Sequence, residues 1–75
     1  MTANAATKKY EVAIFNEIVK KAVREAEKNR TGLSDDWADV HYIEVSAETP
    51  ESAKKKLYNR FPEARGFVIV EVREI

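Results

Sequence analysis

Carboxylate side chains and the only histidine gather in one stretch of the chain, Leu33–Val45, which reads LSDDWADVHYIEV. Carboxylates beside an imidazole can bind a divalent cation or transfer protons. The candidates are Asp35, Asp36, Asp39, His41 and Glu44. Their spacing, DDxxDxH, matches no metal-binding motif and lacks the DxDxDG pattern and closing Glu of a calcium loop. We therefore favour a solvated loop with helix-capping Asp residues and a His at a strand edge, and we expect no bound metal.

Trp37, the single tryptophan, lies within the same stretch and has two interpretations. Its large apolar body favours a position that closes the end of a small core. The alternative is an aromatic side chain that faces a ligand or a partner, in a polar site made by Asp35, Asp36, Trp37, Asp39 and His41.

The constellations needed for covalent catalysis are missing from the sequence. The chain contains no cysteine, and Ser34, Ser46 and Ser52 lack the spacing of a catalytic triad. The only two glycines, Gly32 and Gly66, are too far apart to form a phosphate-binding loop. We favour a protein that is not an enzyme and that uses no cofactor, and a metal-binding or enzymatic role at Asp35–His41 is the third hypothesis.

Basic residues on two predicted helices offer an alternative function. They are Lys20, Arg24, Lys54, Lys56 and Arg60. On neighbouring helices they could form a basic outer surface that binds the phosphates of a nucleic acid. However, 13 basic and 13 acidic residues give a net charge of zero, whereas dedicated nucleic-acid binders usually carry a basic excess. We therefore treat nucleic-acid binding as the second hypothesis.

Alternating apolar residues predict three strands. Lys9–Phe15 and Val40–Ala47 each show the period of two that is typical of a strand with one buried face. Phe67–Val72 reads FVIVEV and begins apolar on both sides, which indicates a central strand or a strand that meets a partner.

Capping residues predict two helices between these strands. Asn16 is a good N-cap, and apolar residues at helical spacing follow it, which predicts a helix over residues 16–30. Thr49 caps the second helix, Pro50 suits its first position, and Pro62 ends it.

These elements predict an α+β fold: a two-layer sandwich with a three-stranded sheet, two helices on one face and the order β-α-β-α-β. Residues 1–7 are expected to form a disordered tail and residues 8–75 a single domain. The second helix joins strands two and three by a crossover, which is right-handed if these strands are parallel neighbours. A strand between them would instead give a ferredoxin-like variant.

The predicted sheet leaves one face uncovered. Strict alternation places Phe15, Tyr42, Phe67 and Ile69 on the side away from both helices, where a two-layer fold has nothing to cover them. An apolar patch of this kind usually marks an interface. The alternative is that the N-terminal tail or the loop before the second strand folds over it.

The segment Glu44–Ile75 resembles a strand–helix–strand tail of small bacterial and phage proteins, in which a strand ends in Ala-Glu, a T/S-P-E-x-A helix follows and a Val-rich strand closes the domain. It is also similar to small ribosomal-type α/β domains. The resemblance covers under half of the chain and implies no functional residues.

The length of the chain favours self-association. A domain of 75 residues buries only about 60% of the surface that its unfolded chain exposes, and without cysteine it has no disulfides to stabilise it. We expect a small cytoplasmic domain, with no membrane segment, that binds a protein partner or itself as a homodimer through Phe15, Tyr42, Phe67 and Ile69.

Overall fold

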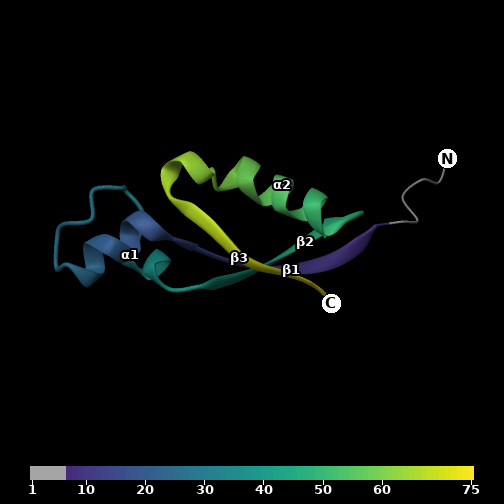
Figure 1. Cartoon of the computed structure of the whole chain (residues 1–75), viewed down its shortest axis with the longest axis horizontal. Coiled ribbons are helices and arrows are strands. Elements are labelled where there is room, and N and C mark those ends of the chain that lie inside the picture. The colour runs from purple at the N-terminus through teal and green to yellow at the C-terminus, as the bar shows by residue number, and fades with distance from the viewer. Residues whose placement is uncertain (1–6) are drawn as a thin grey trace.

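The computed structural model describes residues 7–75, which form one three-stranded sheet, two α-helices and two short 3-10 helices (Figure 1). The strands are β1 (Lys8–Asn16), β2 (His41–Ala47) and β3 (Phe67–Glu74). The helices are α1 (Glu17–Arg24), η2 (Asp35–Ala38), α2 (Pro50–Arg60) and η3 (Glu63–Arg65). The predicted α+β class and the order β-α-β-α-β are confirmed. Apart from Thr7, the predicted tail lies outside the described residues.

The sheet has the order β2-β1-β3, and β1 is antiparallel to both of its neighbours. Strands β2 and β3 therefore run parallel to each other with β1 between them, which is the second of the two arrangements that the sequence leaves open. The chain crosses from β2 to β3 through α2, which lies over one face of the sheet (Figure 1).

The core lies between α2 and this covered face. Tyr10 and Val12 of β1 are buried together with Ala53 and Leu57 of α2 and Ala47 at the end of β2. Complete burial of a Leu side chain contributes about 1.5–3 kcal/mol. The start of α2 is as predicted, with the hydroxyl of its N-cap threonine accepting the backbone N–H of the third helical residue at 3.0 Å.

Helix α1 begins at Asn16, whose side chain is completely buried and has three hydrogen-bond partners. Its Oδ1 accepts from the backbone N–H groups of Ile18 and Val19 at 3.0 and 3.1 Å, as an N-cap does. Its Nδ2 donates to the carbonyl oxygen of Arg65 at 3.0 Å, and the N–H of Glu17 donates to the carbonyl of Gly66 at 2.8 Å. The start of α1 is therefore fastened to the turn that precedes β3.

The predicted helix over residues 16–30 is wrong in its length, because α1 ends before Ala26. Ala26 has a φ of 55°, in the left-handed region. Its N–H donates to the carbonyl of Val23 at 3.2 Å, and the N–H of Glu27 donates to the carbonyl of Ala22 at 2.8 Å. These two bonds form a Schellman motif, with alanine in the position that glycine usually takes.

The two helices also differ in placement. The sequence predicts both over one face, but α1 extends beyond the end of the sheet and packs mainly against η2 (Figure 1). The reason is that β1 runs directly into α1, with no connecting residues that could turn the helix back over the strands. Among residues 7–75, no helix is long and apolar enough to cross a membrane.

Candidate interaction surface

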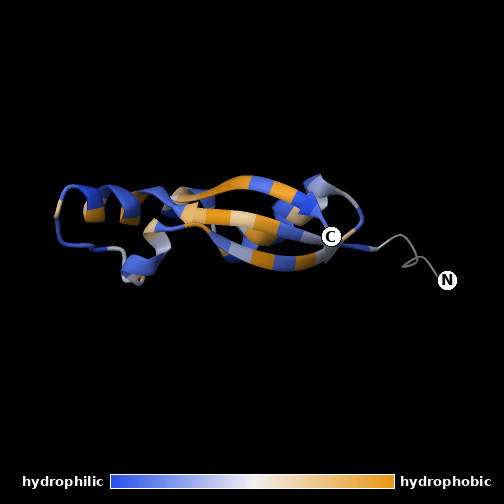
Figure 2. Cartoon of the chain, turned by 90° about the horizontal axis from the view of Figure 1, so that it is seen from below, coloured by the Kyte–Doolittle hydropathy of each residue, from blue (hydrophilic) through white to orange (hydrophobic). Residues whose placement is uncertain are grey.

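One face of the sheet, the open face, has no helix of residues 7–75 over it (Figure 1). Side chains of cross-strand partners lie on the same face, so the register assigns its residues. Phe15 pairs with Val68, and Ala13 pairs with Tyr42, and all of these alternate with core residues. Figure 2 views the sheet from the side opposite α2, with apolar residues concentrated toward α1 and polar residues toward the C-terminus.

The apolar half of the open face is accessible to solvent. We define it by the residues nearest α1, which are Ala13, Phe15, Tyr42, Val68 and Val70. Tyr42 is 65% exposed and Val70 is 58% exposed, while Phe15 and Val68 are half-buried. Ala13, in the central strand, has the smallest side chain of the five and is only 5% exposed.

The apolar half continues onto α1. Phe15 and Ile18 line one hollow of about 580 Å³, together with the basic side chain of Lys20. The Nζ atom of Lys20 lies 5.0 Å from the centre of the Phe15 ring, within the range of a cation–π contact. Glu17, Lys21 and Arg24 complete the lining, so the surface of α1 beside the open face combines apolar side chains with a net positive charge.

The charged half of the open face lies at the opposite end of β1 and is held by ion pairs. Lys9 pairs with Glu44 at 3.8 Å, and Arg73 pairs with Glu11. Exposed pairs of this kind contribute at most about 1 kcal/mol each. Their main effect is to keep this half of the face hydrated, so the two halves differ sharply in polarity.

The prediction that Phe67 and Ile69 lie on the open face is wrong, because β3 contains a bulge. Ile14 pairs with Ile69, but the next residue of β1, Ala13, pairs with Glu71, so Val70 is an extra residue. Because side chains alternate along a strand, one extra residue moves every side chain beyond it to the opposite face of the sheet.

The bulge places Phe67 and Ile69 on the covered side. Ile69 packs against the core under α2, and Phe67 is 3% exposed. The Phe67 ring lies 5.3 Å from that of Phe61 and 5.1 Å from that of Trp37. In their place, Val68 and Val70 join Phe15 and Tyr42 in the open face.

Side chains of α2 bond to both edges of the sheet. On β3, the N–H of Ile69 donates to Tyr58 Oη at 3.1 Å. On β2, the carbonyl oxygen of Ser46 accepts from Lys56 Nζ at 2.6 Å. Free strand edges are the usual sites of unwanted pairing between sheets, and bonded or charged edges oppose it. These contacts leave the open face as the better site for a partner.

The polar segment predicted from the sequence takes part in local structure. Trp37 stacks on His41 at 4.2 Å and also contacts Phe61, so it closes the end of the core beside α1. His41 Nε2 lies 3.0 Å from the carbonyl oxygen of Asp36, and Asp35 accepts a hydrogen bond from a loop asparagine at 2.9 Å. Asp39 follows η2 as its C-cap and is exposed. Within residues 7–75, no three acidic, His or Cys side chains are placed to hold a metal ion.

The predicted basic residues fall into two groups. Lys20 and Arg24 lie on α1, beyond the end of the sheet, while Lys54, Lys56 and Arg60 lie on α2, above it. In the α2 group, Lys56 bonds to the edge of β2 and Arg60 lies over the Phe61 ring. The helices therefore do not bring the five residues together in one surface.

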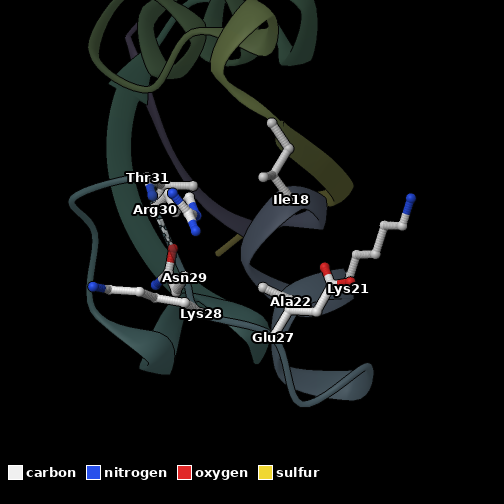
Figure 3. A pocket seen from close by; sticks show the side chains of 8 residues that line it. All are labelled: Ile18, Lys21, Ala22, Glu27, Lys28, Asn29, Arg30 and Thr31. Atoms are coloured by element: carbon white, nitrogen blue, oxygen red, sulfur yellow. Dashed lines mark hydrogen bonds between the residues drawn. The ribbon is translucent and has the colours of Figure 1, made fainter.

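A hollow of about 670 Å³ lies between α1 and the loop that follows it (Figure 3). Lys21, Lys28 and Arg30 line it, above Ile18 and Ala22. Figure 3 shows the side chains of Lys21 and Lys28 pointing to opposite sides, so the cations do not converge on one point. An anion in the hollow would therefore contact only one of these cations at a time.

Comparison of the chain with protein families, with curated proteins and with solved structures finds no match in any of the three. Function must therefore be argued from the fold and from the chemistry of its surface.

Proposed function

We propose that the protein is a non-catalytic interaction domain that forms a homodimer through the apolar half of its open face. The observation that carries this proposal is the exposure of Tyr42 and Val70 beside Phe15 and Val68, on the face of the sheet that no described element, from Thr7 to Ile75, covers. Contiguous exposed apolar residues on a small domain usually mark a contact with another protein.

Stability considerations support a second copy as the partner. A domain of this size, without disulfides, gains from any additional burial of apolar surface. Each square ångström of apolar surface that association removes from water contributes about 25 cal/mol before the costs of association. The absence of cysteine also suits a reducing compartment, and we place the domain in the cytoplasm.

The test compares Val70→Asp with Ile75→Asp by sedimentation equilibrium. Both side chains are apolar and about equally exposed, at 58% and 54%, but only Val70 belongs to the apolar half. We expect the parent chain and Ile75→Asp to have twice the 8.6 kDa mass of one chain, and Val70→Asp to have the mass of one chain. A parent chain that stays monomeric at millimolar concentration would overturn the proposal.

The second hypothesis, nucleic-acid binding, is tested in parallel. The charge reversals Lys54→Glu and Arg60→Glu should abolish salt-sensitive retention on nucleic acid if the outer face of α2 binds phosphate. We expect no retention from the parent chain at physiological salt, because the basic residues of α1 and α2 lie in separate groups.

A further inference from the structure

Unpaired charges at the two ends of the apolar half have opposite signs. At the α1 end, Lys20 lies over the Phe15 ring, Arg24 follows one turn later, and Glu17 and Lys21 line the same hollow, so this end carries three cations and one carboxylate. Within residues 7–75, none of these four residues forms an ion pair. At the other end, Glu71 sits beside Ala13 in the register and has no ion-pair partner among the described residues. The neighbouring charges, Lys9, Glu11, Glu44 and Arg73, neutralise one another.

Two copies can pack open face to open face in two symmetric ways. If their β1 strands are parallel, α1 lies against α1, and Lys20 and Arg24 meet the same cations of the other copy. If their β1 strands are antiparallel, α1 of each copy lies over the part of the other sheet that precedes Ala13, and the ammonium group of Lys20, which lies beside Phe15, comes to the level of Ala13 and Glu71. There Lys20 meets Glu71, and the symmetry creates this contact twice. Like charges brought together at an interface are costly, whereas complementary charges fix its register.

Side-chain size favours the same arrangement. Phe15 is the large residue of β1 on this face, and Ala13, two residues earlier, is the small one. In the antiparallel arrangement the Phe15 ring of each copy can pack over the small side chain of Ala13 of the other. A two-fold interface repeats every contact: if Phe15 of the first copy contacts Ala13 of the second, Phe15 of the second copy also contacts Ala13 of the first.

We propose that the homodimer is antiparallel, with Phe15 of each copy over Ala13 of the other and Lys20 of each copy paired with Glu71 of the other. The inference rests on the proposed function, since it assumes that the open face binds a second copy. It adds the orientation, the register and the charge pair that selects them.

The test is a charge exchange, measured as the dimer dissociation constant by sedimentation equilibrium. Lys20 and Glu71 are both exposed, so reversing either charge leaves the fold of one copy intact. We expect Lys20→Glu and Glu71→Lys each to weaken the dimer about tenfold, because each reversal places two like-charged pairs in the interface. The double variant should recover most of this loss. Lys55→Glu, on exposed α2 away from the open face, is the control and should have no effect.

The parallel arrangement predicts the opposite sign for one variant. There, Lys20→Glu removes repulsion between the two α1 helices and should tighten the dimer. A tighter dimer for Lys20→Glu, or a double variant no better than the sum of the single changes, would overturn the antiparallel orientation. Both outcomes can be observed only if the parent chain dimerises. A parent chain that stays monomeric is a different result, and it would overturn the proposed function itself.

Discussion

Replacement of Asn16 by aspartate should destabilise the fold, although Asp and Asn are about equally good N-caps on ordinary helices. The carboxylate can still accept the N–H groups of Ile18 and Val19, and the helix N-terminus favours its charge by about 0.3–1 kcal/mol. It cannot replace the bond from Nδ2 to the carbonyl of Arg65, 3.0 Å away. Two oxygen acceptors then face each other, and the one on residue 16 has no exposed surface.

The magnitude follows from these contacts. The lost hydrogen bond contributes about 1 kcal/mol, and a buried acceptor left without a donor costs about 1–3 kcal/mol. After the favourable effect of the helix N-terminus is subtracted, Asn16→Asp should lower the free energy of unfolding by about 1–3 kcal/mol. In a domain of this length, each kilocalorie corresponds to a fall in Tm of about 4–8 °C.

Urea unfolding followed by the fluorescence of Trp37 measures this difference, because Trp37 packs against Phe61 and Phe67 at the end of the core. The matched control is Thr49→Asp, since Thr49 caps α2 from an exposed position and donates no comparable bond to another element. The control should stay within about 0.5 kcal/mol of the parent chain. An Asn16→Asp variant as stable as the parent would refute the role assigned to the Nδ2 bond.

Three further changes test the backbone and the sheet edge. Gly66→Ala should lower the free energy of unfolding by more than about 2 kcal/mol, because φ is 99° and a Cβ atom would lie 2.7–2.8 Å from side-chain atoms of α1 and its cap. Gly32→Ala is the control: φ is 81° but no atom lies within 4 Å of the added Cβ, so thermal unfolding should show a loss of only about 1 kcal/mol. Ala26→Gly should raise the free energy of unfolding, measured in urea, by about 0.5–1 kcal/mol. Ala22→Gly, inside α1, should lower it by at least as much. If Ala26→Gly instead lowers it, the helix continues through that residue. Tyr58→Phe should cost about 1 kcal/mol, because an N–H at the edge of β3 loses its acceptor, and unchanged thermal stability would contradict that bond.

Most of the local structure could be predicted from the sequence where a residue has a specific backbone role. Thr49 and Pro50 mark the start of α2, Asn16 marks the start of α1, and Gly66 marks the turn before β3. As helix caps or turn residues, they act on their neighbours in the chain, so this part of their effect is visible without knowledge of the fold.

The missed features depend on contacts that lie far apart in the sequence. Alanine has a high helix propensity, so nothing local indicates that Ala26 adopts the left-handed conformation and ends α1. The bulge at Val70 lies within an uninterrupted apolar run, FVIV, where every residue suits either face. The register against β1 decides the matter, and it places Phe67 and Ile69 in the core while exposing Val70.

Contacts between copies across the open face are measured most directly by isotope-filtered nuclear Overhauser spectroscopy on a mixture of labelled and unlabelled chains. In the antiparallel dimer each strand lies over the same strand of the other copy, so the ring protons of Phe15 in one copy should show cross-peaks to the methyl group of Ala13 in the other. The absence of such cross-peaks at a concentration where the protein is dimeric, or cross-peaks only to residues of α2, would contradict the claim that the open face is the site of association.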